Sequence, residues 1–204
     1  MKYKWLEKRE GHSKIIIFFN GWGMDENVVK HLEPDEYDIL MFYDYNSLET
    51  EIEISLINKY SEKYLVAWSM GVMCATLFDI SYTKKIAING TLYPIDDNFG
   101  IPQKIYDLTL KGFSKTCVKK FIENMFNGNL PNIEIIRDLE NQKSELIELK
   151  KYKSNDNFKY DKILISSNDK IIPTKNQVAF WKQLPNVNSG HAPFFLYKRW
   201  RELL

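Results

Sequence analysis

The stretch of sequence that decides the fold runs from Tyr64 to Gly71 and reads YLVAWSMG. Its first five residues are aliphatic or aromatic, the composition of a buried strand. The residues from Gly71 to Ile80 are small or apolar and predict a helix that begins at once. A strand that turns directly into a helix around a small-x-Ser-x-Gly sequence is typical of a nucleophile elbow.

The elbow explains the small residues on either side of Ser69. The turn is so tight that Ala67 and Gly71, two positions before and two after the serine, must be almost without side chains. Ala67 stands where glycine is more usual. The geometry lifts the serine hydroxyl above the edge of the sheet, beside a helix N-terminus that favours negative charge. Ser69 is therefore the predicted nucleophile, and a plain buried turn serine is the alternative.

Outward from this stretch, apolar runs alternate with amphipathic segments, which is the pattern of an α/β protein with a doubly wound, mostly parallel sheet. We expect strands at Met1–Lys8, Lys14–Phe19, Tyr37–Phe42, Tyr64–Trp68, Lys85–Asn89, Lys162–Ser166 and Pro185–Asn188. Helices are expected at Asp25–Leu32, Glu49–Tyr60, Gly71–Ile80, Thr174–Gln183 and Phe194–Leu204.

The alternation stops between Gly90 and Asp161. Two helices are predicted there, Gly112–Phe126 and Pro131–Tyr152, with a turn at residues 127–129. An insertion between two strands of a regular βα series suggests a cap over the carboxyl edge of the sheet. We expect one domain over residues 1–204, with a helical cap insertion at about 91–160.

Composition excludes several classes of protein. Lys plus Arg is 28 and Asp plus Glu is 27, giving a net charge of +1, whereas sequence-independent DNA binding needs a broad positive field. The longest apolar run, Ile15–Phe19, is far shorter than a membrane span. Two cysteines, Cys74 and Cys117, and three scattered histidines show no disulfide framework and no metal-ligand spacing. We expect a soluble, cytoplasmic domain without nucleic acid, metal or cofactor.

A serine nucleophile needs a base, and the candidates are His12, His31 and His191. His191 stands in SGHAPF (189–194), a loop after the last predicted short strand and before the last predicted helix. That position puts it at the same edge of the sheet as Ser69. His12 lies in the turn before the first central strand, and His31 lies at the end of a predicted helix. We therefore predict His191 as the base.

The base in turn needs a carboxylate that fixes its tautomer. Asp169 follows the strand Lys162–Ser166 and lies just past the carboxyl end of that strand. The chain order serine, aspartate, histidine is that of α/β-hydrolases. Asp96 and Asp97, after the preceding strand, remain alternatives for the acid.

The segment NGWGMD (20–25) follows the first central strand and predicts an oxyanion hole. Glycines on both sides of Trp22 let its backbone N–H face the site, opposite the N–H of Met70. A phosphate-binding loop is the other reading of a Gly-x-Gly sequence. It is disfavoured because neither a Gly-x-Gly-x-x-Gly pattern nor a Walker lysine follows.

Three motifs together, FNGWGMD (19–25), AWSMG (67–71) and SGHAPF (189–194), resemble the short BioG-type pimeloyl-acyl-carrier-protein methyl ester esterases, which are α/β-hydrolases. The resemblance covers the whole chain in order and size. Asn20 stands where the longer esterases of the same pathway usually carry histidine. The resemblance implies a serine carboxylesterase that cuts the methyl ester of pimeloyl-acyl carrier protein during the synthesis of the biotin precursor.

The resemblance also implies how such an enzyme would work. The acyl group would pass to Ser69 with loss of methanol, and water activated by His191 would then release it. Aromatic side chains are candidates for lining a channel for the seven-carbon chain, although they could equally fill the core. These are Trp22, Trp68, Phe113 and Phe121.

Acyl carrier proteins are strongly acidic, so a basic surface is the candidate docking site. Lys111, Lys115 and Lys119 stand four residues apart and, with Lys120, predict a basic stripe on the solvent side of one helix. An ordinary solvated face is the alternative. Two other functions stay open, namely a general small-acyl carboxylesterase or thioesterase, and a hydrolase-fold binding protein without catalysis.

Overall fold

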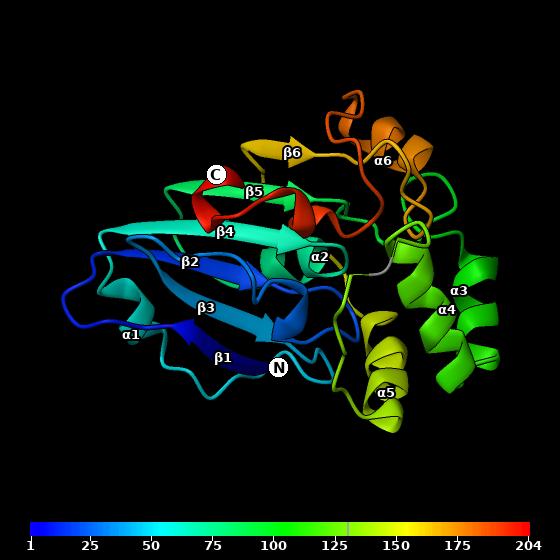
Figure 1. Cartoon of the computed structure of the whole chain (residues 1–204), viewed down its shortest axis with the longest axis horizontal. Helices are drawn as coiled ribbons and strands as arrows, with labels where there is room; N and C mark the ends of the chain where they lie inside the picture. Colours follow the sequence, from blue (N-terminus) through cyan, green and yellow to red (C-terminus); the bar gives the residue numbers. More distant parts are fainter. Residues whose placement is uncertain (130) are drawn as a thin grey trace.

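A six-stranded sheet forms the centre of the molecule, and its strand order is β1-β3-β2-β4-β5-β6 (Figure 1). The computed structural model describes residues 1–129 and 131–204. The strands are β1 (Lys2–Glu7), β2 (Lys14–Phe19), β3 (Asp38–Tyr43), β4 (Glu62–Trp68), β5 (Lys84–Ile88) and β6 (Lys162–Leu164). All neighbours pair in parallel except β1, which is antiparallel to β3. The predicted doubly wound, mostly parallel sheet is confirmed.

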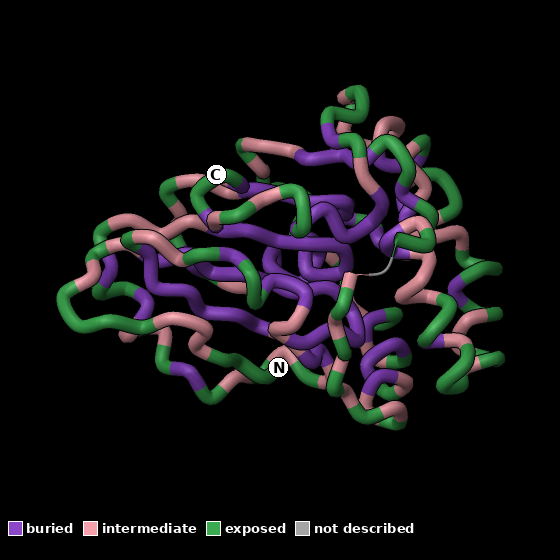
Figure 2. Tube along the Cα trace, in the orientation of Figure 1, coloured by how far each residue is buried: buried purple, intermediate pink, exposed green. Residues whose placement is uncertain are grey.

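The central strand β2 lies between two layers of the hydrophobic core. Residues 15–19 of β2 are fully buried, and successive side chains point to opposite faces of the sheet. Ile15, Ile17 and Phe19 belong to one hydrophobic cluster, whereas Ile16 and Phe18 belong to the other. Figure 2 shows buried backbone running along the middle of the sheet. A strand that is apolar on both faces is therefore covered on both faces.

The strand order changes direction between β2 and β4, which makes this a topological switch point of the sheet. The chain leaves β2 toward β3 on one side and returns through β4 on the other side of β2. Loops that leave the carboxyl ends of two such strands diverge, and the crevice between them is where α/β proteins bind ligands. Here those loops begin at Asn20 and Ser69.

The helices are α1 (Ile54–Asn58), α2 (Gly71–Cys74), α3 (Gln103–Lys111), α4 (Lys115–Met125), α5 (Leu139–Leu149) and α6 (Thr174–Trp181). Within the described residues, 3-10 turns accompany them at Glu26–Val28, Ala75–Leu77, Pro193–Leu196 and Trp200–Glu202. In the part of the chain that the structure describes, no helix combines the length and the apolar composition that crossing a membrane requires.

Several predicted helices are shorter than expected. The prediction of a helix at Asp25–Leu32 is wrong, because only a 3-10 turn forms there. The segment Phe194–Leu204 forms two 3-10 turns, since Glu33 pairs with the backbone on both sides of Arg199 and holds it extended. The predicted strand Pro185–Asn188 is reduced to one bridge between Ser166 and Val187. Short amphipathic segments take their form from such tertiary contacts more than from helix propensity.

In the sequence, α3, α4 and α5 come between β5 and β6. In the structure, these helices lie at the end of the sheet toward which the parallel strands point (Figure 1). Helix α3 was not expected from the sequence. The predicted helix Gly112–Phe126 begins only at Lys115, because Ser114 is its N-cap and accepts a hydrogen bond from the N–H of Cys117. Similarly, the predicted helix Pro131–Tyr152 is confined to α5, where Asp138 caps the first turn.

Candidate active site

Ser69 lies in a strained turn between β4 and α2. Its φ of +57° is left-handed, a conformation that costs a serine of the order of 1–3 kcal/mol. Two backbone hydrogen bonds hold it, since the N–H of Ser69 donates to the carbonyl of Ile88 (3.0 Å) and its carbonyl accepts from Val72 (3.1 Å). Only 4% of the residue is exposed. This is the backbone geometry that the sequence pattern predicted for an elbow.

Gly71 is required by a close approach of two chain segments. A Cβ atom at this position would lie 2.3 Å from the carbonyl oxygen of Phe19 and 2.7 Å from that of Asn20. The end of β2 therefore runs directly against the first turn of α2. This contact brings the loop after β2 alongside Ser69.

Ser69, His191 and Asp169 are joined by hydrogen bonds although they come from three separate loops. Nε2 of His191 lies 2.8 Å from Oγ of Ser69, and Nδ1 of His191 lies 2.8 Å from Oδ2 of Asp169. All three residues are buried. Because an ionised carboxylate only accepts hydrogen bonds, the proton of the imidazole belongs on Nδ1, and Nε2 is left to accept from the serine hydroxyl.

The carboxylate of Asp169 is held on both oxygens. Its Oδ1 accepts from the backbone N–H groups of Ile171 (2.8 Å) and Ile172 (3.0 Å). Its Oδ2 accepts from Nδ1 of His191 and also from the side-chain amide of Gln177 (2.8 Å). Gln177 belongs to α6 and is fully buried. These donors fix the orientation of the acid. Gln177 was not predicted, because one polar residue on a predicted helix carries no signal of its partner.

Trp68 was a candidate for lining the substrate channel, but the structure places it in the core. It is fully buried, packs edge-on against Phe194 with ring centroids 5.1 Å apart, and is absent from the walls of the cavity beside Ser69. Its neighbour Ala67 belongs to the other hydrophobic cluster, because successive strand residues face opposite ways. The indole N–H of Trp68 donates to the carbonyl of His191 (2.8 Å) and so supports the histidine loop.

Asn89 is a second support of the histidine loop, and its role was not predicted. It follows β5, is buried, and has a left-handed φ of +45°. Its side-chain amide donates to the carbonyl of His191 (2.9 Å) and to Oγ of Ser166 (2.7 Å). A polar residue directly after a buried strand is the signal that could have found it.

The other candidate bases and acids have partners elsewhere. His12 pairs with Asp38 at 2.9 Å, and His31 stacks on Phe195 with centroids 4.2 Å apart. Asp96 accepts from the N–H groups of its own loop, and Asp97 accepts from the N–H of Gln103 at the start of α3. The structure gives none of these four side chains a hydrogen bond to Ser69 or His191.

A cavity of about 370 Å³ opens beside Ser69. Its walls come from the loop after β2, from all three inserted helices and from the loop around Lys170. The lining residues are Trp22, Ser69, Met70, Ile101, Ile105, Tyr106, Thr109, Cys117, Lys120, Phe121, Asn124, Leu146, Lys170 and Ile171. Most of this surface is apolar, and the two lysines carry its positive charge.

The predicted channel residues divide into two groups. Trp22 and Phe121 line the cavity and pack edge-on, with ring centroids 4.9 Å apart. Phe113 also packs edge-on against Trp22, with ring centroids 6.1 Å apart, but it is not one of the residues that line the cavity. The backbone N–H groups of Trp22 and Met70 have no hydrogen-bond acceptor within residues 1–129 and 131–204. Trp22 and Met70 both line the cavity, and the described residues make no use of their N–H groups.

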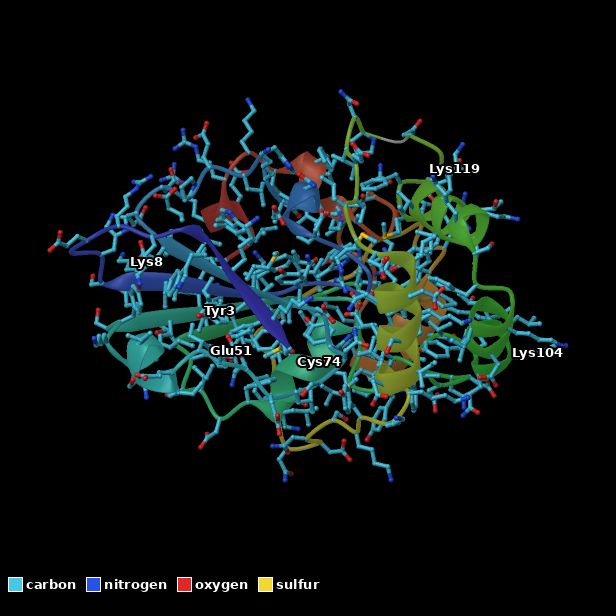
Figure 3. The ribbon with its side chains drawn as sticks, turned by 90° about the horizontal axis from the view of Figure 1, so that it is seen from below. Tyr3, Lys8, Glu51, Cys74, Lys104 and Lys119 are labelled. Carbon is cyan, nitrogen blue, oxygen red and sulfur yellow. The ribbon has the colours of Figure 1, made fainter. Side chains whose placement is uncertain are left out.

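The predicted single stripe of lysines is wrong in one respect. Lys111 is the last residue of α3, whereas Lys115, Lys119 and Lys120 belong to α4. The break falls at Gly112–Ser114, where α3 ends and Ser114 caps α4. All four lysines are exposed, and Lys120 also lines the cavity. Figure 3 shows the outer side of α3 and α4, where Lys104 and Lys119 are labelled.

A buried cluster of charges lies behind the loop after β2. Arg137 donates to Glu145 (3.0 Å) and lies 3.7 Å from Asp44. Burial raises the pKa of the Glu145 carboxyl, and Arg137 opposes that shift. Burial also acts to raise the pKa of Asp44, but Lys2, Asn46 and Arg137 together lower it to about 2. In the described residues, no three His, Cys, Asp or Glu side chains are grouped as a metal site would need.

The strand order and the elbow define the class, because both are those of the α/β-hydrolase fold. A hydrolase from Oleispira antarctica has the same fold, with a TM-score of 0.68 at 11% identity over 95% of this chain and 89% of that one. The chain belongs to the pimeloyl-ACP methyl esterase BioG family, whose sequence model matches residues 1–203.

Two known proteins are similar to this chain over most of its length. The crystal structure of BioG from Haemophilus influenzae has a TM-score of 0.89 and 30% identity, covering 100% of this chain and 99% of that one. A malonyl-[acyl-carrier protein] O-methyltransferase of Bacteroides fragilis (strain 638R) is 35% identical over 185 residues, which is 85% of this chain. The matched part is only 37% of the length of that methyltransferase.

Proposed function

We propose that this protein hydrolyses the methyl ester of pimeloyl-acyl carrier protein, with Ser69 as the nucleophile. The observation that carries the proposal is the hydrogen-bonded series Ser69, His191 and Asp169 at an apolar cavity, with 2.8 Å at each step, in a chain of this family. The reaction class that such a site supports is acyl transfer to water.

The first half of the reaction forms an acyl-enzyme. As Oγ of Ser69 attacks the ester carbonyl, Nε2 of His191 takes the hydroxyl proton, and Asp169 stabilises the resulting imidazolium. The carbonyl oxygen becomes an oxyanion that accepts hydrogen bonds from the N–H groups of Trp22 and Met70. The tetrahedral intermediate then expels methoxide, which takes the proton from His191 and leaves as methanol.

The second half returns the enzyme to its starting state. A water molecule gives a proton to Nε2 of His191 and attacks the acyl carbon, and the same two N–H groups hold the second oxyanion. The bond to Oγ of Ser69 then breaks, and the serine oxygen recovers its proton from His191. The product is a free carboxylic acid, which ionises to a carboxylate.

The lining of the cavity supports a long acyl chain as substrate. A volume of about 370 Å³ lies within the range of small-molecule sites, and walls such as Ile105, Phe121 and Leu146 suit a polymethylene chain. An ester at the distal end of the chain would lie at Ser69, and the end bound to the carrier would leave through the mouth. Lys120 and Lys170 line this same cavity.

Purified protein should release methanol from pimeloyl-acyl carrier protein methyl ester much faster than it cleaves short p-nitrophenyl esters or the thioester of the same carrier. It should also restore biotin-free growth to a strain that lacks its own pimeloyl methyl esterase. Equal turnover of all the esters would favour a general esterase. A wild-type protein that neither turns over nor reacts with a fluorophosphonate probe would be a non-catalytic binding protein.

The carrier protein would dock on the exposed lysines of α3 and α4. Changing Lys111, Lys115 and Lys119 to glutamate together should lower kcat/KM for the carrier-bound ester roughly 10-fold and flatten its salt dependence, because charges at a rim act mainly on association. The same variant should hydrolyse a small soluble ester at an almost unchanged rate. Steady-state kinetics on both substrates from low to high salt would show this.

A matched control reverses three exposed lysines outside the inserted helices, Lys8, Lys30 and Lys59. It makes the same change in net charge and should leave both substrates nearly unaffected. An equal loss on both substrates in the first variant, or the same loss in the control, would remove these lysines as the docking site.

A further inference from the structure

Helix α5 presents polar side chains to the interior of the protein. Gln142 and Glu145 are buried on the same face as Leu146 and Leu149, and the exposed fraction of Glu145 is 0%. A buried carboxylate destabilises a fold unless hydrogen bonds and an opposite charge compensate it. The partners of these two side chains therefore indicate what they do.

Glu145 joins α5 to two loops at the carboxyl edge of the sheet. Its Oε2 accepts from the N–H of Gly23 (3.2 Å) and from Arg137 (3.0 Å), and its Oε1 accepts from the N–H of Tyr45 (2.9 Å). Arg137 in turn donates to the carbonyl of Met24 (3.1 Å). Gly23 and Met24 belong to the loop that supplies the predicted oxyanion-hole group, the N–H of Trp22.

Gln142 holds the same loop at two further points. Its side-chain amide donates to the carbonyl of Gly23 (2.8 Å), and its backbone carbonyl accepts from the indole N–H of Trp22 (2.8 Å). On the other side of Trp22, the N–H of Gly21 donates to the side chain of Asn20 (2.8 Å). The backbone is thus fixed before and after Trp22.

These bonds determine where the N–H of Trp22 points. The neighbouring N–H groups of Gly21 and Gly23 both have acceptors, whereas that of Trp22 has none in the described chain. The residue Trp22 lines the cavity together with Ser69. Gly23 has a left-handed φ of +69°, so the chain turns sharply straight after Trp22. Figure 3 shows α5 standing across the end of the sheet where this loop lies.

We propose that Gln142 and Glu145 are positioning residues, which hold the backbone N–H of Trp22 in the orientation that binds the oxyanion of the transition state. The inserted segment would then contribute to the rate of the chemical step as well as to the walls of the cavity. This inference rests on the proposed esterase function. Neither side chain contacts the substrate in this scheme, since both act through the loop.

The side chain of Gln142 itself argues against a purely structural role. Its Oε1 is buried and has no hydrogen-bond partner in the described part of the chain. An unpaired buried acceptor is unfavourable, and a methionine of similar length would remove it. The methionine would also leave the carbonyl of Gly23 without its donor, so the two effects oppose each other. The free energy of unfolding should therefore change little when Gln142 is replaced by methionine.

Gln142→Met is the main test. We expect kcat for the methyl ester to fall roughly 10-fold with KM almost unchanged, because a loosened oxyanion donor weakens only transition-state binding. The inhibition constant of a trifluoromethyl ketone analogue, whose adduct with Oγ of Ser69 is a hemiketal oxyanion, should rise by the same factor as kcat/KM falls. The inhibition constant of the free acid product should stay the same.

Glu145→Gln is the second variant, because it keeps the shape of the side chain and removes its charge. We expect the same pattern with a larger loss of kcat, together with a lower melting temperature, since Arg137 loses the carboxylate of Glu145 as a hydrogen-bonded counter-charge. The control is Glu140→Gln, the same change at an exposed position of α5, which should alter neither kinetics nor stability. If Glu145→Gln unfolds, Gln142→Met carries the test alone.

A folded Gln142→Met protein with wild-type kcat and wild-type affinity for the ketone would overturn the inference. So would an equal loss of affinity for the ketone and for the acid, because that would indicate a general disturbance of the cavity. Failure of the proposed function looks different, since the wild-type protein itself would then hydrolyse no ester and bind the ketone no better than the acid.

Discussion

Replacing Ser69 by alanine should lower kcat for ester hydrolysis by a factor on the order of 10⁶, which is the effect of removing a triad nucleophile. The reason is that no acyl-enzyme can form without the oxygen that lies 2.8 Å from Nε2 of His191. The protein should stay folded, because alanine fits the space of serine. Initial rates on the methyl ester, with circular dichroism as a test of folding, would measure both expectations.

His191→Ala should cause a loss of similar size, and the double variant should be little worse than either single one. Triad members act as a unit, so once one is absent the remaining one contributes almost nothing. Any residual rate would come from binding and from the N–H groups of Trp22 and Met70. Wild-type turnover by Ser69→Ala would show that another residue carries the reaction.

Replacing Asp169 by asparagine should lower kcat by a factor on the order of 10⁴. The carboxylate accepts from Nδ1 of His191 at 2.8 Å, which leaves Nε2 free to accept the serine proton. An asparagine amide could donate to Nδ1 instead and would favour the tautomer that carries its proton on Nε2. That tautomer cannot act as the base. A full pH–rate profile of the variant would show the loss at every pH.

Asp96→Asn and Asp97→Asn are the matched controls for this change. Both carboxylates accept backbone hydrogen bonds in the loop before α3, so their replacement should affect stability slightly and the rate hardly at all. A large loss of activity in either control, with an active Asp169→Asn protein, would move the acid to the loop after β5.

Local patterns in the sequence were enough to predict the sheet and the elbow. Residues 15–19 are apolar without alternation, so they predict a strand covered on both faces, and small residues around Ser69 predict a tight turn. Parallel strands bring the loops after their carboxyl ends to one edge of the sheet. That rule was sufficient to group Ser69, Asp169 and His191, which the structure places in hydrogen-bond contact.

Only the tertiary structure decided how long the helices are and which polar residues are buried. Trp68 is assigned to the core by the face of β4 on which it lies, and Asn89 supports a loop 102 positions further along the chain. Glu145 lies 122 positions from Gly23, to which it is bonded. A sequence pattern reports the constraints between near neighbours, whereas the free energy of a buried polar group depends on partners that only the folded chain brings within reach.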